Sequence, residues 1–468
     1  MGQNPEQKGR IGKTSHAHQN KVGSSKMYIR NICAFITAVG LHTATAHLIE
    51  DFGAVRDDST LQTALLNSDA IKQAFEAASN VNNEDFVVEI PADSTYHIYS
   101  SDIQDVHDVT FQIDGNLIVH DTIEDWPEEN GLFVFNFEDS TGLTLTGSGT
   151  VDGQGYKWWW ATLLNTRAHN YRPNLFEFAN VEDCVISGFT TKNSPRFNFH
   201  LTDMLNLEVF DLTILTDLKK QEEMLRDHGK WHLDLNIPMF PFNTDGIDPA
   251  GKNIYIHDVY IENWDDAVAV KPSNTKYNRV CTENVLIENV KVKYGVGISM
   301  GSVSANQYHN CINNVTVKNV EFEDPMKAVY IKTNSGGEEG TDSAIVSNIH
   351  YENLTIKNPV WYAIYIGPQQ MKEPDGAGNG CMLYPIGGDD ACPVNPLVPI
   401  YNVTLKDIAI SGGVTPPVVK CNETAPCTGF EFDNVQYTSW ATRAEGWICE
   451  NAFGTEKHLQ PKPCLEQE

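Results

Sequence analysis

Four stretches of the chain repeat one pattern, and this pattern decides the fold: NIYIHDVYI (253–261), NVLIENVKV (284–292), NVTVKNVEF (314–322) and NIHYENLTI (348–356). Each copy begins with Asn, alternates apolar with other residues, and carries Asn or Asp again five residues later. The four copies begin 31, 30 and 34 residues apart. Further copies begin at Asn206 and Asn402, and weaker ones begin at Gly142, Asp183 and Gly429.

An apolar spacing of two, with many β-branched residues, predicts that each copy is a β-strand. A fixed period of tens of residues indicates a solenoid rather than separate globular domains. Helical repeats would need an apolar spacing of three or four, and a propeller would need about four strands in each repeat. A β-sandwich does not explain the constant Asn offset. We therefore predict an all-β fold, a single-domain parallel β-helix whose Asn and Asp residues stack into ladders at the turns.

The cysteines test this register. Cys281 and Cys311 both lie three residues before the Asn of their copies. Stacked strands are about 4.8 Å apart, which suits the Cα separation of a disulfide, so we expect a bridge between adjacent coils. Cys184 lies in an apolar, strand-like run and is expected to be a buried free thiol. Three local bridges are predicted in Gly- and Pro-rich surroundings: Cys381–Cys392, Cys421–Cys427 and Cys449–Cys464.

One segment before the repeats has a helical pattern, SDAIKQAFEAASN (68–80). The open N-terminal end of a solenoid has bare strand edges that invite aggregation. We therefore expect this segment to form a capping helix over that end.

The N-terminal region has the order of a secretory signal. A basic stretch (26–30) precedes an apolar stretch (32–41) and the small-residue site Ala44-Thr45-Ala46. We expect a polar leader over 1–26, a signal peptide over 27–46 and one mature domain over 47–468. No second hydrophobic segment reaches membrane length, so the mature protein is expected to be soluble and secreted.

The net charge and the sequons bear on partners and on modification. The 33 basic and 62 acidic residues give a net charge of −29, which argues against a nucleic-acid or anionic-membrane partner. We expect a monomer. Four Asn-x-Ser/Thr sequons predict N-glycosylation, at Asn314, Asn353, Asn402 and Asn422.

Acidic residues gather at matching offsets of neighbouring coils. NTDGID (243–248) precedes the Asn253 copy, and Asp265-Asp266 follow it. GVG (295–297) occupies the corresponding place in the next coil, and one coil further the strand AVYIK (328–332) carries a Lys. Clustered carboxylates repel one another, so at least one pKa should rise and leave a proton for general acid catalysis. Glycoside hydrolysis needs such a set.

Two other interpretations of these carboxylates remain. A lone Asp often caps a β-helix turn, and we prefer this interpretation for Asp248. Clustered carboxylates also bind calcium, but nothing in the chain matches an EF-hand loop. We predict neither a metal nor another cofactor.

The ordered series NTDGID, NWDDAVAVKPSN, GVGISMGS and YIKT resembles the motifs of glycoside hydrolase family 28, the polygalacturonase family. GTVDGQGYKWWW (149–160) and IEDFGAVRDD (49–58) resemble further segments of that family. The resemblance spans roughly the whole mature chain. It implies a secreted, right-handed parallel β-helix that hydrolyses pectic polysaccharide with inversion.

Carried over residue by residue, the resemblance makes Asp265 the general acid. Asp245 and Asp266 would position and activate the attacking water, Lys332 would bind a substrate carboxylate, and Asn243 would support the site.

The chain departs from the family motifs at two places. Val296 stands where the family has His, which removes a hydrogen-bonding partner near the acid. Tyr330 stands where the family has Arg, so a hydroxyl and an aromatic face replace a bidentate guanidinium at a substrate-binding position. We therefore expect weak activity on plain polygalacturonate relative to a branched or mixed pectic polymer. The alternatives are a degenerate member that binds polysaccharide without cleaving it, and a calcium-dependent β-helical lyase.

Overall fold

The computed structural model of the chain describes residues 46–79, 86–164, 166–168, 171–219, 223, 241–273, 281–370, 381, 384, 392–438, 446–461 and 465–466. The predicted polar leader, and all of the predicted signal peptide except Ala46, lie outside these residues.

Strands make up most of the described chain, together with two α-helices, α1 (Leu61–Ser79) and α2 (Tyr156–Leu163), and two short 3-10 helices, η2 (Ile49–Phe52) and η3 (Ile123–Asp125). The strands are β1 (Ala46–Leu48), β2 (Phe86–Ile90), β3 (Thr95–Ile98), β4 (Ser101–Gln104), β5 (Val109–Ile113), β6 (Asn116–Val119), β7 (Phe133–Glu138), β8 (Thr144–Thr146), β9 (Thr150–Asp152), β10 (Asn174–Ala179), β11 (Glu182–Ser187), β12 (Thr190–Lys192), β13 (Phe199–Phe210), β14 (Thr213–Leu215), β15 (Ile247–His257), β16 (Tyr260–Asn263), β17 (Val268–Val270), β18 (Cys281–Tyr294), β19 (Ile298–Val303), β20 (Asn310–Glu323), β21 (Val329–Thr333), β22 (Ala344–Lys357), β23 (Ile364–Gln369), β24 (Ile400–Ser411), β25 (Val418–Lys420), β26 (Cys427–Thr438), β27 (Ile448–Glu450) and β28 (Ala452–Lys457).

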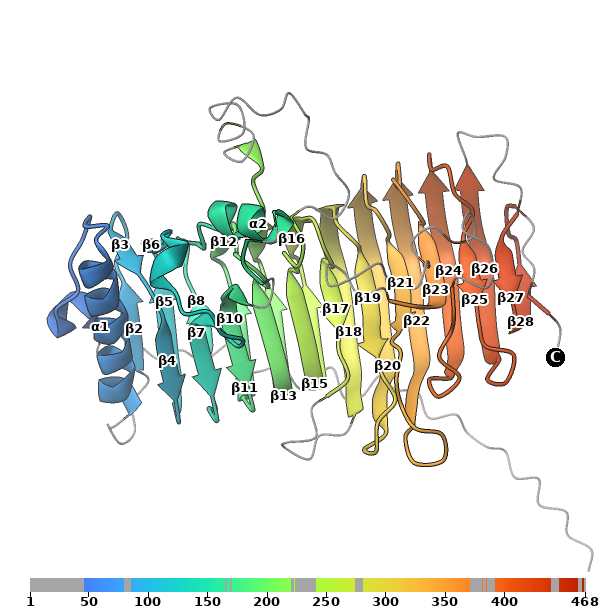
Figure 1. The fold of residues 1–468 in the computed structure, drawn as a ribbon, viewed down its shortest axis with the longest axis horizontal. Coiled ribbons are helices and arrows are strands. Elements are labelled where there is room, and N and C mark those ends of the chain that lie inside the picture. Colours follow the sequence, from blue (N-terminus) through green and yellow to red (C-terminus); the bar gives the residue numbers. More distant parts are fainter. Residues whose placement is uncertain are drawn as a thin grey trace, which may run out of the picture. The chain divides into compact units, whose positions relative to one another are not determined.

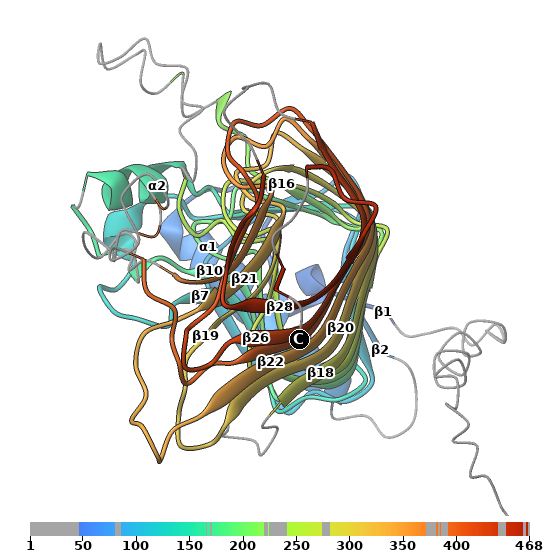
Figure 2. The ribbon, with the colours of Figure 1, turned by 90° about the vertical axis from the view of Figure 1, so that its right-hand side faces the viewer.

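Each coil lays its strands on the coil before it, and the paired strands run parallel. One row of pairings joins β13, β15, β18, β20, β22, β24, β26 and β28. A second row joins β17, β19, β21, β23, β25 and β27. Figure 1 shows the coils following one another from α1 to β28, and Figure 2 shows the two rows on different sides of the stack. The predicted right-handed parallel β-helix is confirmed.

The predicted N-terminal helix is confirmed as α1, which begins seven residues earlier than the sequence pattern indicated. Its apolar face joins the interior of the solenoid, where Phe75 meets the edges of Phe111 and Phe137 at centroid distances of 5.2 and 5.6 Å. Thr60 precedes the helix and its Oγ1 accepts the Thr63 N–H at 3.3 Å, as an N-cap does. No helix of the described residues is long and apolar enough to span a bilayer.

The repeated Asn residues form the predicted ladder. Asn253, Asn284 and Asn314 all have a left-handed backbone, with φ of 58°, 60° and 54°, respectively. Asn tolerates this conformation better than most residues, which explains why the pattern needs it at the bend. Each side-chain amide donates to the Asn of the preceding coil, from Asn253 to Asn206, from Asn284 to Asn253 and from Asn314 to Asn284.

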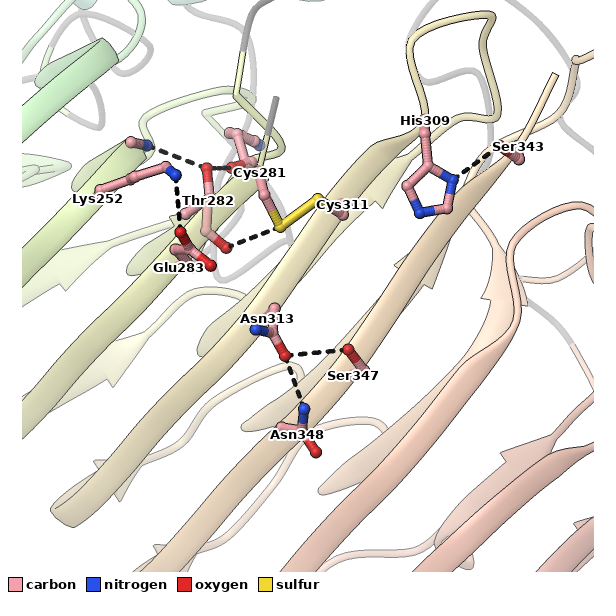
Figure 3. The surroundings of a disulfide bond; sticks show 12 residues. Lys252, Cys281, Thr282, Glu283, His309, Cys311, Asn313, Ser343, Ser347 and Asn348 are labelled. Atoms are coloured by element: carbon pink, nitrogen blue, oxygen red, sulfur yellow. Dashed lines mark hydrogen bonds and ion pairs between the residues drawn. A yellow bond between two sulfur atoms is a disulfide. The ribbon is translucent and has the colours of Figure 1, made fainter. Parts of the chain in front are cut away.

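The disulfides agree with the predicted register. Cys281 pairs with Cys311 in the β18–β20 ladder, and their Cα atoms lie 4.7 Å apart (Figure 3). Two local bridges are also present, Cys381–Cys392 and Cys421–Cys427, and Cys184 is buried and free. Cys464 lies outside the described residues, so the Cys449–Cys464 bridge stays a prediction.

Candidate active site

The structure brings the three predicted catalytic aspartates together. Asp245 lies just before β15, and Asp265 and Asp266 lie between β16 and β17. Ile247 pairs with Val268, so Asp245 and Asp266 occupy equivalent places on adjacent coils. The three carboxylates are buried, and one oxygen from each lies within 4.8 Å of the others.

Asp265 is held by two backbone donors. Its Oδ2 accepts the Asn243 N–H at 2.8 Å, and its Oδ1 accepts the Asp266 N–H at 2.9 Å. Burial, and then the charge of Asp266, raise the pKa of Asp265 to about 6, although Lys332 opposes the shift. A carboxyl group with this pKa retains its proton in mildly acidic solution, as a general acid must.

Asp245 has the environment of a carboxylate under strong repulsion. Burial, followed by the charges of Asp248, Asp265 and Asp266, raises its pKa well above the ordinary value. Its Oδ1 has no hydrogen-bond partner among the described residues. A buried acceptor of this kind is suited to bind a water or a hydroxyl group.

Asp266 forms an ion pair with Lys332 of β21, and both side chains are only 2% exposed. Burial alone would lower the pKa of Lys332, but the charges of Asp266 and Asp265 outweigh it and raise that pKa. Lys332 therefore stays charged. Its ammonium donates to Asp266, whereas the family resemblance implied a contact with substrate.

The three carboxylates form a donor set that a hard cation such as calcium could use. The ammonium of Lys332 already compensates the charge of Asp266. We therefore assign no metal ligands at this site.

The residues at the two motif departures share one small apolar cluster. Val296 is buried there with Met326 and Tyr330. The ring of Tyr330 is 5% exposed, and the Lys327 ammonium lies 3.9 Å from its centroid. The side chain of Val296 thus takes the place of the expected imidazole, one coil from Asp266. The ammonium of Lys327 covers part of the Tyr330 ring.

Further charged residues act on the triad, and His200 among them was not predicted from the sequence. His200 of β13 and Asp248 of β15 pair in register, and His200 Nδ1 lies 2.7 Å from Glu177 Oε1 of β10. Asp248 is fully buried inside β15, with its Oδ2 3.4 Å from Lys271 Nζ. The interpretation of Asp248 as a turn cap is therefore wrong.

Two arginines complete the charged surroundings. Arg172 is buried and Arg196 is half-buried, and the charge of Asp245 acts on both. Burial lowers the pKa of each, that of Arg172 to about 9. The guanidinium group of Arg172 therefore remains charged in acidic and neutral solution.

Comparisons with known proteins agree with this fold. The model of the glycosyl hydrolases family 28 matches residues 82–458. A polygalacturonase from Cryptomeria japonica is 24% identical over 74% of this chain, and the match spans 59% of that relative's length. A probable rhamnogalacturonase A from Aspergillus oryzae is 26% identical over 88% of this chain and 73% of the relative. Among solved structures, the endo-xylogalacturonan hydrolase from Aspergillus tubingensis has a TM-score of 0.63 at 21% identity, with 90% of this chain and 99% of that chain covered. The chain belongs to glycosyl hydrolase family 28 and is a glycoside hydrolase.

Proposed function

We propose that this hydrolase is a secreted monomer that cleaves glycosidic bonds in pectic polysaccharide. Asp265 protonates the leaving oxygen, while Asp245 and Asp266 position and activate the attacking water. The observation that carries the proposal is the buried group of three carboxylates, in which Asp265 has a pKa of about 6.

The surroundings support this division of roles. Asp265 accepts hydrogen bonds only from backbone N–H groups among the described residues. The unpaired Oδ1 of Asp245 offers an acceptor for a water molecule. Lys332 holds Asp266 in a fixed place beside both.

Inversion of configuration is the second part of the proposal, and it rests on the family resemblance. The spacing of the carboxylates does not carry this part of the proposal. The nearest oxygens of the triad lie within 4.8 Å of one another, closer than the roughly 6.5–9.5 Å usual between the carboxyl groups of inverting enzymes. The anomeric configuration of the first product, followed by NMR spectroscopy during the initial turnover, tests this part. A product that retains the substrate configuration contradicts it.

Asp265→Asn tests the enzymatic function against a binding role. We expect loss of turnover on pectic oligosaccharides with binding retained, because the variant cannot donate the proton. Asp93→Asn is the matched control, since Asp93 is exposed and has a left-handed φ of 57° that Asn adopts equally well. Wild-type protein that binds pectin without cleaving it would support the degenerate alternative. Products with unsaturated, ultraviolet-absorbing ends would support the lyase.

We further propose that the substrate is a branched or mixed pectic polymer. Tyr330 replaces a bidentate arginine, which should weaken binding of a uronate carboxylate by about 1.5–3 kcal/mol. Lys332 is engaged by Asp266, so its charge is already partly used. Relatives named for rhamnogalacturonan and xylogalacturonan fit this choice.

Turnover on polygalacturonate and on a mixed polymer, for wild type and Tyr330→Arg, tests the substrate proposal. We expect wild type to prefer the mixed polymer and the variant to gain activity on polygalacturonate. A wild type that prefers polygalacturonate, together with a variant that gains nothing, contradicts the proposal.

A further inference from the structure

Arg172 connects three segments of the chain, one of which contacts Asp265 of the triad. It lies just before β10 and is 1% exposed. Its Nη1 donates to the carbonyl oxygens of Pro195 at 3.1 Å and Phe242 at 2.7 Å. Its Nη2 donates to the side-chain Oδ1 of Asn243 at 2.7 Å. The planar guanidinium therefore fixes the segment before β15 on two neighbouring atoms.

Asn243 passes this constraint to the proposed general acid. Its backbone is left-handed, with φ of 56°, and its N–H donates to Asp265 Oδ2 at 2.8 Å. The Asn243 N–H therefore points at Asp265 only while the Asn243 peptide keeps this orientation. The two bonds from Arg172 to Phe242 and Asn243 hold the peptide on both sides.

The charge of Arg172 also acts on the triad. Charged and titratable groups surround this part of the site on several elements. The charged groups that act on Arg172 or Asp265 are Asp245, Asp266, Lys332 and Arg196. A second set acts on these groups or on one another, namely Asp248, Lys271, His200 and Glu177. The four buried aspartates are thus accompanied by Arg172, Arg196, Lys271 and Lys332.

We propose that Arg172 is a positioning residue for hydrolysis, which holds Asn243 so that its N–H fixes the Oδ2 oxygen of Asp265. This inference rests on the proposed function of Asp265. The effect of Arg172 on Asp265 passes through the hydrogen bond to Asn243, whose N–H binds Asp265, and through the charge of the guanidinium.

Three variants separate positioning from support of the fold. Arg172→Met removes the hydrogen bonds and the charge, whereas Arg172→Lys keeps the charge without the planar fork. Arg167→Met is the matched control. Arg167 also donates to backbone carbonyls, those of Ile123 and Trp126 at 2.8 Å, and none of its described contacts reaches the triad.

For Arg172→Met we expect kcat to fall by about 100-fold, the cost of a small misplacement of a catalytic group, with KM little changed. Loss of the N–H donor and of the positive charge both disfavour ionised Asp265. The high-pH limb of the activity profile should therefore move up by about one pH unit. Arg172→Lys should restore the part of the pH shift that comes from the charge, but not kcat. Arg167→Met should lower stability without moving the profile.

The proposal is overturned if Arg172→Met loses activity only in proportion to its folded fraction, with the pH profile of wild type. If Arg172→Met does not fold, Arg172→Lys carries the test, and wild-type kcat in that variant overturns the proposal. A second readout is independent of turnover, namely the pH at which urea stability changes because Asp265 titrates. This pH should rise in Arg172→Met. A wild type without hydrolytic activity on any pectic polymer would contradict the proposed function, while the urea readout would still decide the role of Arg172.

Discussion

Replacing Asp265 with Asn should change how stability depends on pH, as well as abolish turnover. Burial, and then the charge of Asp266, raise the pKa of Asp265 from 3.8 to about 6. A carboxyl group with a higher pKa in the folded chain holds its proton more strongly there than in the unfolded chain. The folded state therefore binds the extra proton between these two pKa values, and the wild-type protein loses stability as the pH rises through that window.

The magnitude follows from the shift. A difference of about 2 pKa units, at about 1.4 kcal/mol for each unit, corresponds to about 3 kcal/mol of stability lost between pH 4 and pH 7. Asn at this position cannot titrate, so this contribution disappears. Asn also has one carbonyl oxygen for the two N–H donors of Asn243 and Asp266, which costs about 1–3 kcal/mol at every pH. The variant should be less stable than wild type at pH 4 and should recover about 3 kcal/mol relative to wild type by pH 7.

Urea unfolding at pH 4 and pH 7 measures this difference, because urea does not screen charges as guanidinium salts do. Asp93→Asn serves again as the control and should shift equally at both pH values. The reasoning is refuted if the stability difference between wild type and Asp265→Asn is the same at pH 4 and pH 7, within about 1 kcal/mol of measurement error.

Three further predictions concern the fold and the chemistry. Replacing Cys281 and Cys311 with Ser should cost about 3.6 kcal/mol for a separation of 30 residues, against about 2.2 kcal/mol for Cys421 and Cys427, which are separated by 6. Urea midpoints compare the two double variants, and a larger cost for the shorter loop contradicts the estimate. Lys332→Met leaves the buried carboxylate of Asp266 without its partner, so it should lower the free energy of unfolding by about 3–5 kcal/mol and abolish turnover. A stable, active variant would exclude a role for Lys332 in holding Asp266. A chelator should leave turnover unchanged and the products free of unsaturated ends, whereas loss of activity restored by calcium would favour the lyase.

The fold could be predicted because its determinants recur at a constant offset. Asn253, Asn284 and Asn314 start three consecutive copies, and the same residues form consecutive steps of the ladder. Cys281 and Cys311 inherit that register, which is why the inter-coil disulfide followed from spacing alone. The start of α1 was less visible, because the buried face of its first turns includes the polar residues Thr63, Asn67 and Ser68.

The triad could be predicted for the same reason, since adjacent coils place Asp245 and Asp266 at equivalent positions. Arg172 could not, because two of its partners are backbone carbonyls, 23 and 70 residues away, and carbonyls leave no mark in a sequence. Asp248 was misinterpreted because β15 begins at Ile247, six residues before the Asn that starts the recognisable copy.

The asparagine ladder also bears on the timing of maturation. In three of the four sequon residues, Asn314, Asn353 and Asn402, the Nδ2 atom donates to an Asn of the preceding coil. An N-glycan is attached to this same nitrogen. If glycans are added, oligosaccharide transfer has to precede stacking of the coil, and the ladder then keeps a single amide hydrogen at that step. Glycan occupancy at these three asparagines would thus record how quickly each coil closes during folding. Asn422, whose Nδ2 donates to Val394 outside the ladder, supplies the reference.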